Sequence, residues 1–457
     1  MAFKRNFPSI LAAGLLLIFI AGCKVGPNYK QPDIPTGEQY RFAGTGDSIS
    51  FADTSWTYVF RDTILQQLIW QGLAYNFDLL MAIERVNQAR ASFKNVRADL
   101  WPSLSASATG AYQNQQTFPS GTIEYKDIYA TANLTWELDI WGKLRRAKES
   151  ARADLLAQEA YRQSVYITLI ANIASGYFNL VEYQDQLQIA TYNVRIREEA
   201  LSLVKLKMIA GTVSGLVVAQ AEAELASIKT QVPAFEKAVG LQENALRLLA
   251  GQLPGEVVTG DSIINQIRIG VVPDAGIPSQ LITRRPDIIQ AEQTLVSANA
   301  QIGVARAYML PSLSITANIG YSNIGAGLIG SAIGNLVAPI FSFGKLKANL
   351  RKAQAFREEM LLNYQKTIYT AIGEVSNGIL TVEKQRVVTN ENHNLVAAAQ
   401  TSFDLSNQLF NAGYASYLDV INAQRSLYGA QIQLSLAQTD DLLGIVNLYL
   451  ALGGGWK

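Results

Sequence analysis

The chain has 457 residues, with 38 Lys and Arg against 37 Asp and Glu, and 49% of its residues are hydrophobic. A formal net charge of +1 gives no electrostatic basis for binding nucleic acid. One His and one Cys are too few for a zinc site, a thiol site or a Ser-His-Asp triad, so we expect no enzymatic activity, metal or cofactor. The mean hydropathy of +0.10 is too low for a polytopic helical membrane protein.

The first 22 residues have the layout of a secretory signal. Lys4 and Arg5 precede an apolar run over 10–21, which is too short to span a bilayer. The run ends at Cys23, the only cysteine, which resembles a bacterial lipoprotein signal with cleavage before Cys23 and lipid attached to it. An ordinary signal peptide followed by an incidental Cys is the alternative. Lys24 after the Cys favours outer-membrane sorting by the same resemblance, and we expect residues 23–61 to be an extended segment.

The remainder of the chain is an internal duplication. Trp141-Gly142-Lys143-Leu144 and Phe343-Gly344-Lys345-Leu346 lie 202 residues apart, and two proline-free segments of equal length follow them. We expect repeats over 62–251 and 279–457, joined by a linker over 252–278. Each repeat should contain a helix, a β-hairpin, a long helix and a return helix. The predicted bounds are 103–139 and 312–343 for the hairpins, 143–210 and 345–412 for the long helices, and 216–250 and 417–452 for the return helices.

Each long helix would be a rod of roughly 100 Å at 1.5 Å per residue. In the first, apolar residues recur at alternating spacings of four and three, and a second stripe lies beside the first. Two stripes suit a helix with a neighbour on each side, as in a helical barrel, whereas a two-helix coiled coil needs one. The first stripe is Leu169, Ile173, Gly176, Leu180, Tyr183, Leu187, Ala190 and Val194, and the second is Ile167, Ile170, Ala174, Tyr177 and Val181.

The hairpins show period-two alternation. Strands are expected from Ser103 and up to Asp139, with a polar loop over 113–126 between them. In the second hairpin the return strand is expected over 335–343, with Pro339 disturbing it. Strands of about ten residues fit a tilted crossing of the outer membrane, although a soluble sandwich would alternate in the same way. Four strands cannot close a pore, so three chains would pool twelve.

Five short motifs occur along the chain: 26–29 (GPNY), 284–288 (RRPDI), 298–306 (ANAQIGVAR), 311–313 (PSL) and 450–456 (LALGGGW). Together they are similar to the TolC-like outer-membrane efflux family, in its lipoprotein branch of the OprM or NodT type. The resemblance covers nearly the whole mature chain. It implies a fold that is mainly α with membrane β: a homotrimer with a twelve-stranded barrel and a long α-helical barrel. It also implies a periplasmic adaptor and an inner-membrane transporter of the RND type as partners.

The same resemblance assigns roles to the turns between long and return helices, which face the adaptor in this family. A plain helix stop is the alternative for the glycines. Family members narrow the tunnel near the second turn with acidic side chains one helical turn apart, often beside a Leu. Leu418 and Asp419 fit that pattern, and Asn422 stands where a second Asp is common, so threefold symmetry would form a ring of three carboxylates. A merely solvated Asp is the alternative. The predicted adaptor contacts are Gly211, Thr212, Val213, Ser214, Gly215, Gly413, Tyr414, Ala415, Ser416 and Tyr417.

Basic residues open both long helices. Positive charge at a helix N-terminus opposes the macrodipole, so helix stability is not its purpose. We predict that these residues lie near the inner headgroup layer, facing lipid phosphate or pairing across chains, with a solvated surface as the alternative. The first cluster is Lys143, Arg145, Arg146 and Lys148, and the second is Lys345, Lys347, Arg351 and Lys352.

Residues 325–330 (GAGLIG) resemble a dinucleotide fingerprint. No βαβ unit follows, and no Asp or Glu lies between Glu292 and Glu358 to bind a ribose, so we interpret the run as an apolar extracellular loop. The sequence therefore predicts a passive outer-membrane exit duct of a tripartite pump for drugs or other small molecules. A type I protein-secretion exit channel and a lipid-anchored periplasmic adaptor are the alternatives.

Overall fold

The computed structural model describes residues 24–42, 55–117, 121–260, 275–322 and 327–454. The predicted signal over 1–22, Cys23 and part of the predicted linker lie outside these ranges. The chain divides into two compact units. Unit 1 contains residues up to Ile34, Glu84–Ala160 and Ile289–Lys366; unit 2 contains Pro35–Ile83, Tyr161–Ile288 and Thr367–Lys457. Each unit draws on both sequence repeats, so the repeats are not the compact units.

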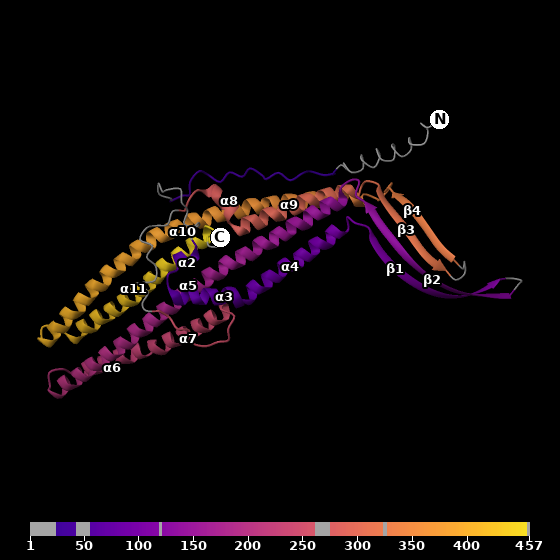
Figure 1. Cartoon of the computed structure of the whole chain (residues 1–457). Coiled ribbons are helices and arrows are strands. Elements are labelled where there is room, and N and C mark those ends of the chain that lie inside the picture. The colour runs from indigo at the N-terminus through magenta and orange to yellow at the C-terminus, as the bar shows by residue number, and fades with distance from the viewer. Residues whose placement is uncertain (1–23, 43–54, 118–120, 261–274, 323–326, 455–457) are drawn as a thin grey trace. The chain divides into compact units, whose positions relative to one another are not determined.

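Helices make up most of the described residues, and the four strands all lie in unit 1 (Figure 1). The two long helices have equal lengths of 67 residues and begin at the predicted lysines. In chain order the elements are α2 Trp56–Val59, α3 Thr63–Tyr75, α4 Phe77–Ala98, β1 Ser103–Thr117, β2 Gly121–Leu138, α5 Lys143–Ile209, α6 Gly215–Lys229, α7 Gln231–Leu249, the 3₁₀ helix η3 Pro278–Gln280, α8 Leu281–Arg284, α9 Pro286–Ala307, β3 Ser312–Ser322, β4 Gly327–Val337, α10 Lys345–Asn411 and α11 Tyr417–Ala451.

The strands form one antiparallel sheet in the order β1-β2-β3-β4, in which two hairpins lie side by side although α5 to α9 separate β2 from β3 in the chain (Figure 1). The polar loop predicted over 113–126 is wrong, because β1 and β2 continue pairing to Thr117 and Gly121, with Gln113 opposite Tyr125. A β-ladder is held by backbone groups, so a polar run does not end it. The strands therefore have 15 and 18 residues, longer than the sequence indicated.

The return strand of the second hairpin also differs from the prediction. It spans Gly327–Val337 rather than 335–343, and it includes the end of the run that we interpreted as a loop. Isoleucines stand opposite glycines in this ladder, with Ile319 paired to Gly330 and Ile315 to Gly334. The strand ends before Pro339, which has no N–H to donate to a ladder.

The first return helix, predicted as one helix over 216–250, is two helices that meet at Thr230. Pro233 explains the break, because it has no N–H to donate to the carbonyl of Lys229 four residues earlier. The second return helix, α11, contains no proline and runs unbroken for 35 residues.

The core of unit 2 forms around the middle of α5. Ile173, Ala174, Tyr177 and Leu180 are each at most 1% exposed, and they pack against residues of α3, α7 and α11. Both predicted stripes contribute to this core. One stretch of α5 is apolar enough to resemble a membrane span, but 56% of it is buried inside the chain, as in a core helix.

Candidate functional site

The two helix tips have the same backbone design. Gly211 and Gly413 adopt left-handed φ angles of 75° and 81°, which favour glycine. Each is followed by a residue whose amide donates back over one turn: Thr212 N to Lys207 O at 2.9 Å, and Tyr414 N to Leu409 O at 2.8 Å. This bonding satisfies carbonyls that the helix end would leave free. The glycines are therefore required by the turn itself.

The predicted adaptor-contact residues differ in how far their side chains are exposed to solvent. Most are exposed, and Tyr414 is the most prominent at 84%, whereas Val213 and Ala415 are half-buried. Tyr417 is 7% exposed and packs with Val204 and Val218, so its prediction as a contact residue is wrong. Its ring fills the space between the two helical hairpins, a long-range contact that the local pattern did not reveal.

Two exposed apolar side chains at the first tip were not among the predicted contact residues. Ile209 is 79% exposed and Leu216 is 67% exposed. Water-exposed aliphatic side chains at a turn are a signal of a docking surface. They flank the predicted tip residues directly, so extending that range by one or two residues on each side would have found them.

The predicted gate residues lie on the exposed side of the first turns of α11. Leu418 is 50% exposed, and Asp419 and Asn422 are also exposed. Asp419 closes a capping box, because its carboxylate accepts from the Ser416 amide at 2.9 Å and from the Ser416 hydroxyl at 2.6 Å. These hydrogen bonds lower the pKa of Asp419, which keeps it ionised. Asp419 therefore has a structural role beside any role in a gate.

A buried ion pair on the same helices, farther from the tips, was also not predicted. Glu224 of α6 is 6% exposed and binds Arg197 of α5 and Arg425 of α11, and the Arg197 guanidinium also donates to the Glu224 carbonyl at 2.8 Å. The pair connects three helices of unit 2. No local spacing links residues so far apart in sequence, so a single sequence carried no signal for it.

The predicted helix start over 284–288 has a structural explanation. The Arg285 guanidinium binds Asp287 and Glu374 at 2.7 Å and donates to the Ala451 carbonyl at 2.8 Å, so it joins α9, α10 and α11 in unit 2. A pocket of about 520 Å³ lies beside it, lined also by Asn447. Arg285 has its bonding capacity largely used, which favours a structural role.

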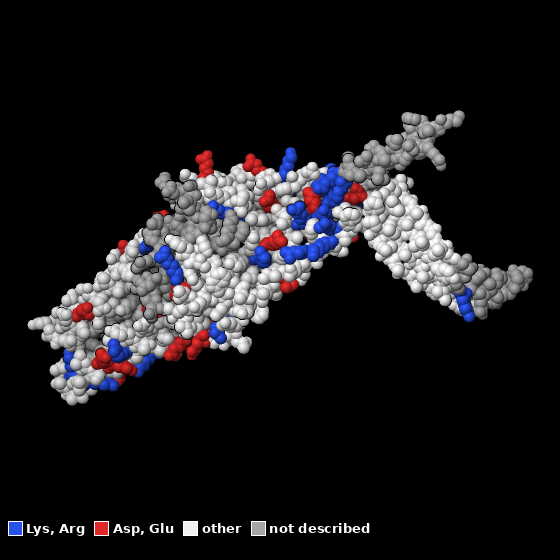
Figure 2. Space-filling view, in the orientation of Figure 1, with Lys and Arg blue, Asp and Glu red and all other residues white. Residues whose placement is uncertain are grey.

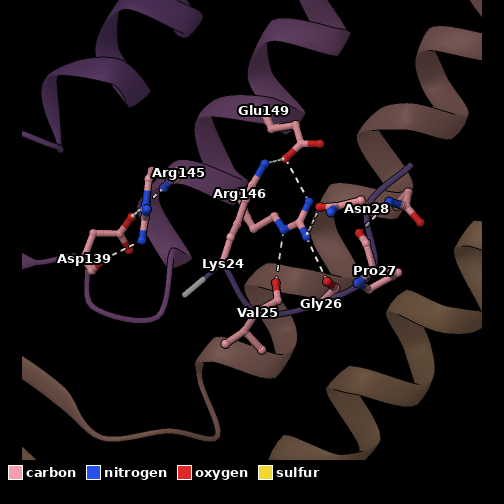
Figure 3. A network of polar contacts seen from close by, with 10 residues as sticks. Lys24, Val25, Gly26, Pro27, Asn28, Asp139, Arg145, Arg146 and Glu149 are labelled. Atoms are coloured by element: carbon pink, nitrogen blue, oxygen red, sulfur yellow. Dashed lines mark hydrogen bonds and ion pairs between the residues drawn. The ribbon is translucent and has the colours of Figure 1, made fainter. Parts of the chain in front are cut away.

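The two basic clusters have different surroundings. In the first, Lys143 pairs with Glu137, Arg145 pairs with Asp139, and Arg146 is fully buried. The prediction of a lipid-facing side chain is therefore wrong for Arg146, which contacts the N-terminal segment of its own chain instead (Figure 3). Its charge is neutralised internally, and that is what outweighs the helix dipole.

The second cluster is exposed throughout: Lys345, Lys347, Arg351 and Lys352 all lie on the surface at the start of α10. Figure 2 shows Lys and Arg gathered where the helices of unit 1 meet the sheet, while the visible face of the sheet is almost free of charge. In the ladder of β3 and β4, Tyr321 stands opposite Leu328 and Leu313 opposite Leu336, so one face of the sheet is apolar, with Leu328 82% exposed and Leu336 68% exposed. Such a face, with cations beside it, is typical of a membrane strand next to the headgroup layer.

These features define the class of protein. An outer-membrane channel has a sheet with an apolar face, duplicated helical hairpins and tips that turn at glycine. The chain belongs to the outer membrane efflux protein family, whose family model matches residues 68–252 and 277–454. The predicted family and fold class are thus confirmed, as is the function of an outer-membrane efflux channel.

Curated relatives and solved structures agree. The toluene efflux pump outer membrane protein TtgC of Pseudomonas putida is 32% identical over 98% of this chain and 96% of its own length. The cation efflux system protein CusC of Escherichia coli strain CFT073 is 29% identical over 98% of this chain and 99% of its own. The open-state MtrE outer membrane channel of Neisseria gonorrhoeae superposes with a TM-score of 0.87 at 28% identity, covering 95% of this chain and 99% of that one.

Proposed function

We propose that three copies of this chain form one channel, with twelve strands closed into a barrel. The observation that carries this proposal is the open edge of the four-stranded sheet: within the described residues, β1 and β4 each pair on one side only. In lipid an open edge leaves backbone N–H and C=O groups unpaired, which excludes a lone four-stranded sheet. Twelve strands fall within the size range of known barrels.

Cross-linking tests the pooled sheet. In a Cys23→Ser background, one cysteine at Ala108 of β1 is combined with single cysteines along β4 from Ala332 to Leu336. We expect one register to yield covalent trimers under oxidation, because β1 of one copy must pair with β4 of the next. A matched set with the β1 cysteine moved to Ala91 of α4 should give none. Dimers only, or no cross-link in any register, would contradict the twelve-stranded barrel.

The cargo of the channel is proposed to be drugs or other small organic molecules, delivered through a periplasmic adaptor from an inner-membrane transporter of the RND type. The 32% identity with TtgC, which is named for toluene, supports this cargo class. Deleting the gene should lower the inhibitory concentration of several unrelated hydrophobic compounds. Unchanged resistance together with loss of a secreted protein would favour the type I secretion alternative.

The gate assignment is a proposal about Leu418, Asp419 and Asn422. Their exposure and the ionised state of Asp419 support it, but the capping box offers a competing explanation. Single-channel conductance in planar bilayers separates the two. Asp419→Ala should raise the open probability and abolish block by divalent cations, whereas Ser416→Ala removes the cap and keeps the carboxylate. Equal effects of both variants would show that Asp419 acts only as a cap, and absence of pores in the wild type would refute the duct.

The adaptor contact is proposed for the exposed tip residues, including Ile209 and Leu216 in addition to the predicted turns. Their exposed aliphatic surface supports it. Leu216→Asp and Tyr414→Asp should abolish the drug resistance that the channel confers and leave its conductance unchanged. Arg195→Asp on the exposed surface of α5 is a control away from the tips. Full resistance in both tip variants would contradict this contact surface.

Lipid attachment at Cys23 and phospholipid contact by the second basic cluster complete the proposal. The sequence around Cys23 supports the first, and the exposure of four cations beside an apolar sheet supports the second. Metabolic labelling with palmitate should mark the wild type and spare Cys23→Ser. Replacing Lys345, Lys347, Arg351 and Lys352 by Gln should weaken binding to phosphatidylglycerol vesicles by about tenfold, and unchanged binding would contradict the lipid contact.

A further inference from the structure

Arg146 is a fully buried cation whose partners come mainly from the N-terminal end of the described chain. Its guanidinium uses four of its five N–H groups (Figure 3). The acceptors are Val25 O at 3.0 Å, Gly26 O at 2.9 Å, Asn28 Oδ1 at 2.9 Å and Glu149 Oε2 at 3.0 Å. Three of the four belong to residues 24–31, which we call the N-terminal strap.

Backbone contacts hold the strap against the start of α5. Val25 N donates to Trp141 O at 3.0 Å, and Lys24 forms an ion pair with Glu149. A Cβ on Gly142 would lie 3.1 Å from the Lys24 Cα, so the strap backbone rests on this glycine. Lys24 and Val25 therefore lie at the junction of β2 and α5.

The strap crosses α9 where neither backbone carries a side chain. Gly26 has a left-handed φ of 96°, and a Cβ there would lie 2.5 Å from the Gly303 Cα. A Cβ on Gly303 would lie 2.7 to 2.8 Å from the Arg146 side chain. Asn299 donates to Pro27 O at 3.0 Å and fixes the crossing. The groove thus fits this peptide in both shape and hydrogen bonding.

The strap continues along unit 1 beyond the crossing. The Tyr29 hydroxyl donates to Glu292 Oε1 at 3.1 Å, and Gln31 Nε2 donates to the Tyr364 hydroxyl at 3.3 Å. These contacts join it to α9 and α10. They are single, partly buried contacts, whereas the fully buried Arg146 guanidinium makes four charge-assisted ones, so Arg146 is the strongest point of attachment.

The residues that form this groove are not repeated at the equivalent positions of the duplication. At the 202-residue offset Arg146 corresponds to Ala348, and at the 209-residue offset that relates Pro102 to Pro311, Gly303 corresponds to Lys94. Asn299 corresponds to Arg90 at that same offset. The corresponding positions on α10 and α4 therefore lack the guanidinium donor of Arg146, the space above Gly303 and the side-chain amide of Asn299. The strap can dock at one of the two symmetry-related places only.

We propose that Arg146 is the receptor of a latch that closes on residues 24–28 and holds this segment beside the β2–α5 junction. Without the strap, a buried guanidinium would lose three of its four acceptors, which strongly disfavours the undocked state. The latch does not depend on the proposed acylation of Cys23, because its contacts involve only residues 24–28 and their partners in unit 1.

Hydrogen exchange of the strap, measured by mass spectrometry on the full-length protein in detergent, tests the latch. In Arg146→Met, exchange of the peptide covering residues 24–31 should become at least tenfold faster. Lys347→Met removes an exposed cation near the start of the second long helix, at the position that corresponds to Arg145. It should leave the exchange rate of residues 24–31 unchanged. Protection of residues 167–181 in the α5 core reports whether the fold survives. Wild-type protection of the strap in folded Arg146→Met would overturn the proposal.

A milder variant decides the case if Arg146→Met does not fold. Asn28→Ala removes one acceptor from the exposed strap and should still accelerate exchange, by a smaller factor of about three. Wild-type exchange in Asn28→Ala would then overturn the latch.

Palmitate labelling separates the latch from the anchor. Cys23→Ser should lose the label and keep a protected strap, since Arg146 rather than lipid holds it. A strap that becomes unprotected in Cys23→Ser would overturn the proposal. A wild-type protein that takes no label but keeps a protected strap would refute acylation and support the latch.

Discussion

The two junctions between sheet and long helix share one sequence pattern and differ in almost everything that surrounds it. At the first, the Trp141 indole donates to Pro311 O at 2.7 Å, and the Asp139 carboxylate accepts from the amides of Leu144 and Arg145 at 2.9 Å. At the second, the residue equivalent to Asp139 is Phe341, which is 75% exposed. Phe343 is 90% exposed and takes a left-handed φ of 46°, which costs energy for a residue with a side chain.

The difference teaches that duplication kept the course of the backbone and changed what each copy contacts. The first junction is closed by its own chain, through the cap, the indole and the strap. The second presents aromatic and cationic side chains outward, which suits a surface that lipid or another copy covers. Equal sequence punctuation therefore indicates equal secondary structure, and it does not indicate an equal environment.

The largest effect is expected from the glycines of the two junctions. Both have left-handed φ angles, 75° at Gly142 and 83° at Gly344, so alanine is strained at either. A Cβ on Gly142 would also press on the Lys24 backbone at 3.1 Å, whereas nothing lies within 4 Å at Gly344. Gly142→Ala should lower the free energy of unfolding by about 3 kcal/mol and Gly344→Ala by about 1 kcal/mol. Urea titration of the detergent-solubilised protein measures both, and equal losses would contradict the comparison.

Local signals in the sequence were sufficient for the course of the backbone. The Gly-Lys starts and the glycine turns placed α5 and α10 within one residue of their observed ends, Ile209 and Asn411. Glycine, proline and the switch of period are properties of neighbouring residues, so they can be read from one chain. Three exceptions were local: Pro233 divides the first return helix, polar residues extend the ladder of the first hairpin, and the return strand of the second hairpin lies at Gly327–Val337 rather than 335–343.

Long-range partners could not be predicted. Arg146 looked like a surface cation because its acceptors, Val25 and Gly26, lie 121 and 120 residues away. Tyr417 looked like a tip residue because its neighbours Val204 and Val218 belong to the other hairpin. Burial in both cases results from packing between distant segments, and no local periodicity encodes it.

An intermediate effect on stability is expected from a pair of equivalent residues in the middle of α5 and α10. Glu182 of α5 is 6% exposed, while its equivalent 202 residues later, Lys384, has a side chain that is 64% exposed. Burial raises the pKa of Glu182 from 4.5 to about 7, and the nearby carboxylates of Asp440 and Asp185 add to this shift. The Gln186 amide, which donates to Glu182 Oε1 at 2.8 Å, opposes this rise in pKa.

The folded state therefore binds a proton that the unfolded state lacks between pH 4.5 and 7. Stability should fall as the pH rises through this window, by on the order of 2 kcal/mol, and level off above it. Glu182→Gln should remove most of this slope, and Lys384→Gln should retain it. Thermal midpoints at pH 5 and pH 8 measure the difference. A slope that persists in Glu182→Gln would place the titrating group elsewhere.

The smallest effect on folding is expected from single substitutions at the two junctions. The first junction should contribute to folding and the second to membrane binding. Asp139→Ala removes the acceptor for two helix amides and for the Arg145 side chain, so it should cost about 1 kcal/mol of folding free energy. Phe341→Ala deletes an exposed ring that contacts Phe343, with ring centroids 4.3 Å apart, and should hardly change the unfolding midpoint in detergent. It should instead weaken vesicle binding, because its apolar surface is available to lipid. If Asp139→Ala also weakened vesicle binding and left folding intact, the first junction would be a membrane surface like the second, and the contrast between a closed and an open copy would fail.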